Sequence, residues 1–464
     1  MNTETQTFWS SLREAVRGSQ QDLTAIPIRR AVVLLAVPTI LEMSMESVLT
    51  IVDIFFVSRL GSSAVATVGL TESMLAPTYA LAMGLSAAAT AVISRRAGEK
   101  DWGAAAFAAV QVIFLATAAA GTLGLAAFAA PHLLDAMGAD AEIVRGGAAY
   151  TAVMLGGSLT IFLLFVVNAI FRSVGDAAIA MRSLWLANIV NIGLAPCLIF
   201  GLGPFPRLGL AGAAIATTFS RGLGVAYQMT VLARRRGHLS IGRSQIALRL
   251  PLVRELVKLA TPATGQVLVE TASWLGLVRI LSTYGSAALA GYTIAMRVVI
   301  FSLLPSWGLA QAAAALVGQN LGANEPQRAR KSVWTIARYN VAFLAPIGVV
   351  CAVAPGALVS FFSSDPVVAA YAIDCLRIVS IGFVVFAFGM VAVQAFNGAG
   401  DTTTPMVINL VSFWGFKIPF ALALAKGAGM GPRGVFLAIT AAYTLQSVVA
   451  GGLFRRGKWE AKRV

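Results

Sequence analysis

Three acidic residues lie inside one long apolar stretch near the beginning of the chain. Glu42, Glu46 and Asp53 follow one another at intervals of four and seven residues, with Thr50 between the last two. In an α-helix this spacing places all four side chains on one face. An ionised carboxylate inside a lipid bilayer costs about 2.5–3.5 kcal/mol on insertion scales, so acidic residues at that depth usually carry function. Reversible binding of a cation is the chemistry that such a stripe offers.

A second apolar stretch carries a shorter polar stripe, made of Gln266, Glu270 and Ser273. Burial favours the neutral form of a carboxylate, so both stripes predict groups that can exchange a proton. We therefore expect the acidic residues of both stripes to couple cation movement to transport. Their polar neighbours Thr50, Gln266 and Ser273 are candidates for the lining of a substrate cavity.

The same acids also have a structural interpretation. They could hydrogen-bond between helices, or pair with one of three basic residues in apolar stretches, namely Arg221, Arg297 and Lys417. Lys417 could be a counter-ion for Glu270 in the cavity or a cation that only packs. Glu72 could belong to the coupling group or extend toward the outer membrane surface.

Two prolines stand at matching places in the two apolar stretches. Pro38 and Pro262 each remove a backbone donor and permit a helix to bend. Paired breaks of this kind are typical of transporter hinges, although a kink needed only for packing gives the same pattern. Further candidates for the cavity lining are Thr217 and aromatic residues that attract cations through their ring faces, with the aromatic set comprising Trp274, Trp307, Trp414, Phe386 and Phe388.

The elements that position these residues must lie in a membrane. Of the 464 residues, 58% are hydrophobic and only 12% are charged, a composition that cannot cover a water-soluble protein. The sequence predicts an all-α protein with twelve transmembrane helices, because apolar runs of about 20 residues recur along it. They span residues 31–57, 64–94, 103–129, 144–171, 177–201, 208–233, 253–281, 287–318, 328–353, 367–396, 403–425 and 432–454.

Basic residues gather in every second loop. They concentrate in segment 1–30, around residues 95–100 and 172–182, in the linker 234–252, around 328–338 and in the tail 455–464. The positive-inside rule therefore predicts that both termini are cytoplasmic, with the protein in the inner cell membrane. Anionic lipid explains the net charge of +15 better than nucleic acid does, so we expect no nucleic-acid partner.

The chain repeats itself. Leu35, Pro38 and Glu46 recur at the same mutual spacing in the second half as Leu259, Pro262 and Glu270, and Leu277 takes the place of Asp53. A second match, displaced by one further position, relates the Phe171 region to the Phe396 region. Because each copy holds an even number of spans, both enter the membrane from the same side. The repeat predicts two six-helix lobes, 31–233 and 253–454, related by a pseudo-two-fold axis along the membrane normal.

Enzymatic motifs are missing from the sequence. It contains no phosphate-binding loop, HExxH, GxSxG or CxxC pattern. Cys197, Cys351 and Cys375 have no metal-binding spacing, and His132 and His238 are far apart. We expect no enzyme, no cofactor and no metal centre, unless Na+ binds at Asp53 or Glu270.

Four stretches of the sequence resemble the MATE (multidrug and toxic compound extrusion) family. They are LAVPTILEMSMESVLTIVDIFFVSRLGSSAVATVGL at 35–70, GAAIATTFS at 212–220, VGQNLGANEPQRAR at 317–330 and FNGAGDTTTP at 396–405. Each is a loose motif, but their order within twelve spans is specific. The resemblance implies a V-shaped pair of six-helix bundles that exports cationic or amphiphilic compounds in exchange for H+ or Na+.

The resemblance also implies roles for individual residues. Asp53 stands where the family carries the coupling aspartate of its first helix, and Glu270 matches a glutamate in the seventh helix of one branch. Asn191 fits an NxxxD pattern in the fifth helix, but Ala195 replaces the acid. The tenth-helix aspartate of that branch is missing, with Phe386 near its place. These departures leave both H+ and Na+ open, and Glu42 and Glu46 are candidates to replace the missing acid.

The main expectation is a monomeric antiporter of small amphiphilic molecules in a lipid bilayer. One alternative is a flippase for lipids or lipid-linked oligosaccharides, which would require a basic cavity and often two further helices. Another is a membrane receptor or scaffold, which would need a folded domain outside the membrane, whereas the loops here are short.

Overall fold

The computed structural model describes residues 3–19, 21–234, 239–242 and 245–462. Within these ranges the chain is helical and contains no strand. His238 and parts of the linker 234–252, including Arg235, Arg236 and Arg243, lie outside the described residues. The all-α prediction is confirmed.

The first half of the chain forms one lobe of long helices, preceded by the short helix α1 (Thr3–Arg17). Its members are α2 (Ile28–Ser58), α3 (Ser62–Gly98), α4 (Trp102–Gly124) with η1 (Leu125–Ala129) and α5 (Ala130–Ala136), α6 (Ala141–Gly156) with α7 (Ser158–Ser173), α8 (Ala177–Phe200) and α9 (Leu210–Ala233).

The second half repeats this arrangement. It is built from α10 (Leu250–Leu281) with η3 (Ser282–Tyr284), α11 (Ser286–Gly322), α12 (Pro326–Val353), α13 (Pro355–Val359), α14 (Pro366–Ser380) with α15 (Phe383–Gly398), a composite span of α16 (Thr403–Asn409), η4 (Leu410–Lys417), α17 (Ile418–Leu422) and η5 (Ala423–Gly427), then α18 (Pro432–Arg455) and η6 (Lys458–Ala461).

The predicted twelve spans correspond to helices or bent helix pairs of the described chain. Nine spans are long and apolar enough to cross a membrane by themselves, and α14 with α15, bent by 57°, makes a tenth. The other two predicted segments are α9 and α10, which are helices of 24 and 32 residues. The six-plus-six arrangement is therefore complete, as the fold class requires.

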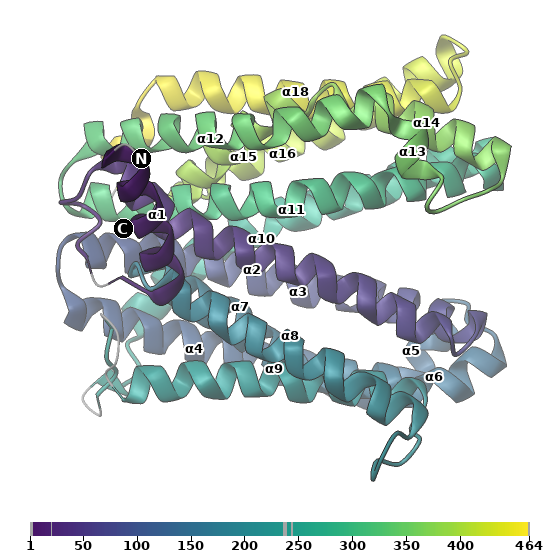
Figure 1. Cartoon of the computed structure of the whole chain (residues 1–464), viewed down its shortest axis with the longest axis horizontal. Coiled ribbons are helices and arrows are strands. Elements are labelled where there is room, and N and C mark those ends of the chain that lie inside the picture. The colour runs from purple at the N-terminus through teal and green to yellow at the C-terminus, as the bar shows by residue number, and fades with distance from the viewer. Residues whose placement is uncertain (1–2, 20, 235–238, 243–244, 463–464) are drawn as a thin grey trace.

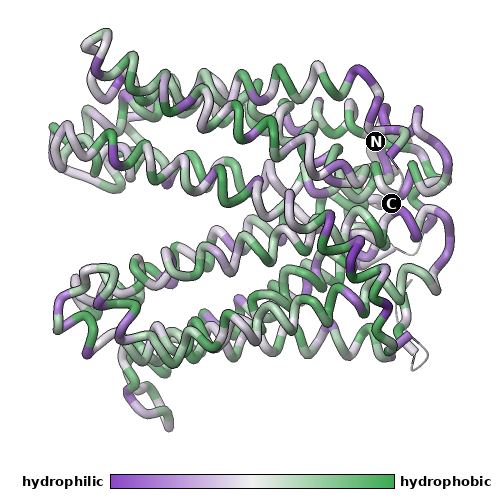
Figure 2. Tube along the Cα trace, turned by 180° about the vertical axis from the view of Figure 1, so that it is seen from behind, coloured by the Kyte–Doolittle hydropathy of each residue, from purple (hydrophilic) through white to green (hydrophobic). Residues whose placement is uncertain are grey.

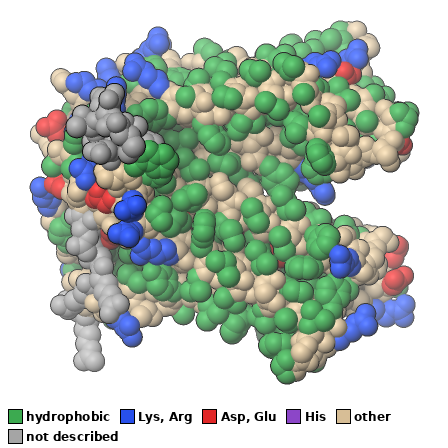
Figure 3. All heavy atoms as spheres, in the orientation of Figure 1, with side chains coloured by type: hydrophobic (Ala, Val, Ile, Leu, Met, Phe, Trp, Pro, Cys, Tyr) green, Lys and Arg blue, Asp and Glu red, His purple; other side chains and the backbone are tan. Residues whose placement is uncertain are grey.

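The two lobes diverge from a common end like the arms of a V (Figure 1). At that end α3 packs along α10 and α2 packs along α11. Since α10 and α11 are the repeat copies of α2 and α3, the two contacts exchange under the pseudo-two-fold relation. Both chain termini lie at the closed end, and the space-filling view shows a notch between the arms at the opposite end (Figure 3).

Repeat-related glycines permit the close approach of the lobes at the closed end. A Cβ atom on Gly98 would lie 1.9 Å from the carbonyl oxygen of Gln319, and one on Gly322 would lie 2.0 Å from that of Arg95. Gly98 and Gly322 occupy equivalent positions in the two copies of the repeat, so the same device is used once by each lobe. Any larger residue at either position would force the lobes apart.

The distribution of polarity matches a membrane protein. Hydrophobic residues run along the length of both arms, and hydrophilic residues gather at the closed end and at the far tips (Figure 2). Four spans depart from the regular helices that the sequence predicts, among them the bent pair α14 and α15 and the span in which the 3-10 helix η1 follows α4. α6 and α7 are separate helices that meet at Gly157, which packs against Thr218, and η4 and η5 are π-helical.

Candidate functional site

A cavity of about 290 Å³ lies within the C-terminal lobe and reaches α3 of the other lobe. Its walls come from α10, α11, α14, α15, α16 and α18, and are mostly aliphatic or aromatic. The lining residues are Met83, Gln266, Val267, Glu270, Met296, Val299, Ile300, Leu303, Leu304, Trp307, Val379, Phe386, Met390, Val393, Gln394, Asn409, Ile439, Tyr443 and Gln446. Of these, only Glu270 bears a formal charge.

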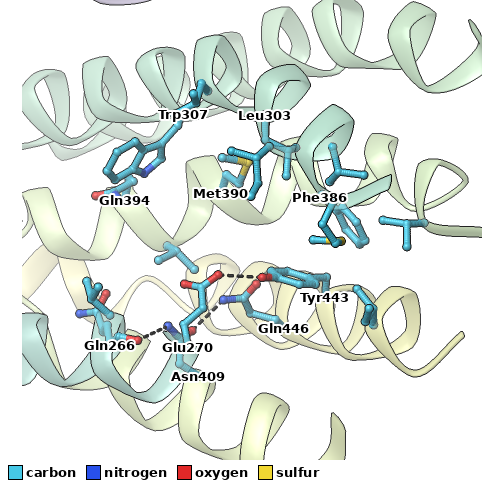
Figure 4. A pocket seen from close by; sticks show the side chains of 18 of the residues that line it. Gln266, Glu270, Leu303, Trp307, Phe386, Met390, Gln394, Asn409, Tyr443 and Gln446 are labelled. Atoms are coloured by element: carbon cyan, nitrogen blue, oxygen red, sulfur yellow. Dashed lines mark hydrogen bonds between the residues drawn. The ribbon is translucent and has the colours of Figure 1, made fainter. Parts of the chain in front are cut away.

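Glu270 projects from α10 toward α18 (Figure 4). Its carboxylate oxygen Oε1 accepts a hydrogen bond of 2.7 Å from the hydroxyl of Tyr443. No described basic residue forms an ion pair with Glu270. The carboxylate is half-buried and borders the cavity, so an entering cation can reach it without first breaking a salt bridge.

A network of amide side chains forms the polar floor of this cavity. Gln266 donates to Asn397 at 3.0 Å and to the carbonyl oxygen of Thr402 at 2.9 Å. Gln446 donates to the side-chain oxygen of Asn409 at 2.7 Å. Because the amides satisfy one another, they fix the wall beside Glu270 in a neutral, preorganised form.

A smaller cavity of about 60 Å³ lies at the junction of the lobes. It shares Met83, Gln266, Trp307 and Gln394 with the larger one, so the two adjoin. Arg172 of α7 also lines it. The smaller cavity therefore borders the N-terminal lobe at Arg172, the residue that pairs with Glu42.

Glu42 is locked in the interior of the N-terminal lobe. Its Oε1 accepts a hydrogen bond of 2.7 Å from Arg172 and one of 2.8 Å from Asn168. The Glu42 side chain is only 1% exposed. Gln228 of α9 donates to both Asn168 and Ser183, which extends the network across further helices of the lobe. Here the inter-helix pairing that the sequence left open is the observed arrangement.

Glu46 has looser partners. Its Oε1 lies 3.7 Å from the guanidinium group of Arg221, and its Oε2 accepts a long hydrogen bond of 3.5 Å from the side-chain amide of Asn188. Of the three basic residues considered as partners, Arg221 is the one that forms an ion pair with a stripe acid in the described chain. Arg221 also donates to the hydroxyl of Tyr79 at 3.4 Å.

Asp53 stands apart from these pairs. It is half-buried, and no described residue donates a hydrogen bond to it or forms an ion pair with it. Arg221, Glu46 and Glu72 lie within electrostatic range of its carboxylate. Asp53 does not line either of the two cavities described above, so the two predicted coupling acids Asp53 and Glu270 belong to separate sites.

The remaining stripe and cavity candidates have local partners. Thr50 is exposed and donates to the carbonyl of Glu46, and Ser273 is buried and donates to that of Glu270. The side-chain amide of Asn191 donates a hydrogen bond of 3.0 Å to the hydroxyl of Thr217. The side-chain oxygen of Asn191 is buried and accepts no hydrogen bond from the described residues. None of these four lines either cavity, whereas Gln266 and Phe386 do.

Lys417 lies behind the cavity wall. Its side chain is 2% exposed, and its Nζ is 4.4 Å from the ring centroid of Phe413 and 5.7 Å from that of Tyr443. No direct ion pair joins it to Glu270. Both prolines lie within helices that continue through them, Pro38 in α2 and Pro262 in α10.

Repeat-related positions hold different chemistry in the two lobes. The charged pair Glu42 and Arg172 recurs in the second copy of the repeat as the neutral pair Gln266 and Asn397, which is also hydrogen-bonded. In the last span of each lobe the matching N-cap glycines Gly209 and Gly431 set an offset of 222, so Glu46 and Arg221 correspond to Glu270 and Tyr443. The second lobe therefore keeps one carboxylate of the stripe and neither of these two arginines.

Several residues of these sites were not predicted. Tyr443, Asn409 and Gln446 come from the last two spans, where single polar residues in apolar runs were the available signal. Arg172 was assigned to a cytoplasmic loop because it ends an apolar run, yet it is 5% exposed. Among the described residues, no cluster of three or more His, Cys, Asp or Glu side chains could hold a metal ion.

The sequence matches one family model, MatE, over residues 38–197 and 262–423, one block in each half of the chain. A probable multidrug resistance protein NorM of Thermotoga maritima is 25% identical, with 94% of each chain covered. An FAD transporter of Shewanella oneidensis is 26% identical, covering 94% of this chain and 96% of that protein.

The fold also matches solved structures. An outward-facing structure of a multidrug resistance MATE family transporter superimposes with a TM-score of 0.88 at 24% identity, covering 97% of this chain and 98% of that one. At this level of identity the superposition establishes the twelve-helix, two-lobe fold. The family itself follows from the sequence match to both halves.

Proposed function

This chain belongs to the MatE family of membrane transporters, and we propose that it is a multidrug antiporter that exports cationic or amphiphilic small molecules in exchange for H+ or Na+. The observation that carries the proposal is the position of Glu270, the single charged residue on the wall of an otherwise apolar, aromatic and amide-lined cavity. A molecule with an apolar body and one positive charge matches such a lining.

The orientation follows from charge. Hydrophilic segments lie at the closed end of the V together with both termini (Figure 2), and lysine and arginine side chains are seen there (Figure 3). The positive-inside rule supports a cytoplasmic location for that end in the inner cell membrane. The notch would then open to the outside, so the conformation described is the one that releases substrate. We keep residues 31–233 and 253–454 as the two lobes that move, and a monomer as the working unit.

Exchange follows from competition for one carboxylate. A coupling cation that reaches Glu270 from the outside neutralises it and removes the attraction for a cationic substrate, which then leaves through the notch. Loss of the cation toward the cytoplasm restores the negative charge after the lobes have changed orientation. We propose Pro38 and Pro262 as the points at which α2 and α10 bend during this change.

The N-terminal stripe would act as a second coupling site. Asp53 has the arrangement that a reversible cation site needs, a half-buried carboxylate without a fixed partner among the described residues. Glu46, Arg221 and Asn191 lie on the helices around it and would tune its charge, while the buried pair of Glu42 and Arg172 would hold the helices in register.

The test is efflux of ethidium from proteoliposomes under an imposed pH or Na+ gradient. We expect Glu270→Gln to reduce gradient-driven efflux by about ten-fold or more, equivalent to at least about 1.4 kcal/mol, and Asp53→Asn to reduce it as well. Glu142→Gln, at an exposed position, is the matched control. Unchanged efflux by folded Glu270→Gln protein would remove this residue from the mechanism.

A further inference from the structure

The wall around Glu270 offers few free ligands for a metal cation. Hard cations take several oxygen ligands. The amide oxygen of Asn409 already accepts from Gln446, and that of Gln266 accepts from Asn397 at 3.3 Å. The hydroxyl of Tyr443 is committed as a donor to the carboxylate. A Na+ ion at Glu270 would have to displace these internal hydrogen bonds.

A positively charged side chain of the protein, Lys417, already lies near this carboxylate. Lys417 is within electrostatic range of Glu270, and Tyr443 links them: its ring lies 5.7 Å from Nζ and its hydroxyl lies 2.7 Å from Oε1. Phe413 and Tyr443 stabilise the ammonium group with their ring faces. The side chain is almost completely buried, so bulk water and salt screen its charge only weakly.

The local fold explains why a lysine reaches this place. Lys417 is the last residue of the π-helical segment η4, and Pro419 follows in α17. Proline lacks the N–H that would bond to the carbonyl four residues earlier and clashes with that carbonyl, so a regular α-helix cannot continue through it unchanged. The wider turn alters which residues of this span face the lobe interior, and π-bulges of this kind are frequent at functional sites.

The N-terminal lobe has no equivalent. The equivalent span of the first copy, α8, contains no lysine, and the cation beside Glu46 comes instead from Arg221 of α9. The counterpart of Arg221 beside Glu270 is the neutral Tyr443. The second lobe thus lacks the direct arginine and carries a lysine on another helix, one aromatic ring away from the carboxylate.

We propose that Lys417 determines ion specificity at the C-terminal cavity: its positive charge balances Glu270 and excludes Na+ from that carboxylate. This inference rests on the proposed role of Glu270 in exchange. A bound Na+ would place two cations against one carboxylate, whereas protonation of Glu270 inserts no ion and needs no new oxygen ligands. Lys417 is a specificity residue here, not a group that touches the transported molecule.

Direct binding of radioactive Na+ to the purified full-length protein tests the inference. We expect no saturable binding that depends on Glu270 in the unmodified protein, and a gain of at least about ten-fold in Na+ affinity, about 1.4 kcal/mol, in Lys417→Met. Lys417→Arg retains a cation and should not bind Na+. Lys426→Met removes a lysine from an exposed position in the same span and should behave as the unmodified protein does.

Transport separates this inference from the proposed function. In proteoliposomes, ethidium efflux by the unmodified protein should not respond to a Na+ gradient through Glu270, and Lys417→Met should gain a Na+ response that Glu270→Gln removes. If folded Lys417→Met exports ethidium without any Na+ response or binding, the inference is wrong and the antiporter proposal survives. If the unmodified protein exports nothing under either gradient, the proposed function itself fails. Should Lys417→Met not fold, Na+ binding by the unmodified protein that Glu270→Gln abolishes would still overturn the inference.

Discussion

The two lobes share one repeat but hold their acids in different ways. In the N-terminal lobe, Glu42 is clamped to Arg172 at 2.7 Å and Glu46 lies 3.7 Å from Arg221. In the C-terminal lobe, Glu270 is held by the hydroxyl of Tyr443 and borders a cavity of about 290 Å³. We expect a carboxylate with an arginine partner to contribute to architecture, and one held by a neutral hydroxyl to remain open to exchange.

The strongest test of this contrast converts the buried charged pair into its neutral repeat equivalent. Arg172→Asn alone leaves Glu42 buried without its cation and should destabilise the protein by about 3–5 kcal/mol. Adding Glu42→Gln recreates the pair that Gln266 and Asn397 form in the other lobe and should recover most of the loss. Thermal unfolding in detergent measures both; a double variant no more stable than Arg172→Asn would refute the equivalence.

The next test removes the neutral partner in the C-terminal lobe. Tyr443→Phe deletes the hydroxyl that donates to Glu270 and should cost about 1.5–3 kcal/mol, since hydrogen bonds to charged groups are worth that much. We expect the same variant to lower ethidium efflux, which a purely architectural tyrosine would not do once the protein is folded. Tyr339→Phe, at an exposed position, provides the control.

A smaller effect is expected where an acid has no partner. Asp53→Asn removes no ion pair and no hydrogen bond among the described residues, so the unfolding free energy should change by about 1 kcal/mol or less. Efflux under a gradient should nevertheless fall. A large loss of stability with normal efflux would place Asp53 with Glu42 as an architectural residue and reverse our assignment.

The smallest effect concerns an ion pair at the closed end of the molecule. Asp22 pairs with Lys100 at 2.9 Å, and although burial alone would raise its pKa, hydrogen bonds from Thr24 and Lys100 and the charge of Lys100 lower it to about 2. Because the pKa of Asp22 is lower in the folded protein than in the unfolded chain, the ionised carboxylate stabilises the fold at pH values above about 4. This stabilisation is lost as the pH falls from about 4 toward 2.

Because this pair is exposed, it should contribute only about 0.2–1 kcal/mol. We therefore expect Asp22→Asn to lower the melting temperature slightly and by the same amount at pH 7 and pH 5. A difference that disappears between these two pH values would contradict the pKa. Comparison with Arg172→Asn then gives the range between a surface pair and a buried one in the same protein.

Much of the fold could be predicted because it depends on local properties. Apolar runs of membrane length locate the spans, and the recurrence of Pro38 and Glu46 as Pro262 and Glu270 reveals the two lobes. The sequence also proposed Gln266 and Phe386 as cavity-lining residues, and both line the cavity beside Glu270. It did not foresee the π-helical turn before Pro419, since the propensity of a long apolar run favours a regular helix.

The partners of the acids could not be predicted in the same way. Arg172 lies 130 residues from Glu42, and Tyr443 lies 173 residues from Glu270. No local pattern links such residues, because the angle between helices and the depth of each side chain decide which of them meet. Asp53 and Glu270 look alike as intramembrane acids, yet only one of them borders the cavity.

Helix length, hydropathy and period are set residue by residue, so the order of amino acids alone was enough to specify a twice-repeated helical bundle with carboxylates at bilayer depth. Which carboxylate has an arginine, which has a tyrosine and which has neither was settled by the way the helices of each lobe pack. The free energy of a buried charge depends on atoms that long-range packing brings within a few ångströms, and no local pattern encodes those atoms.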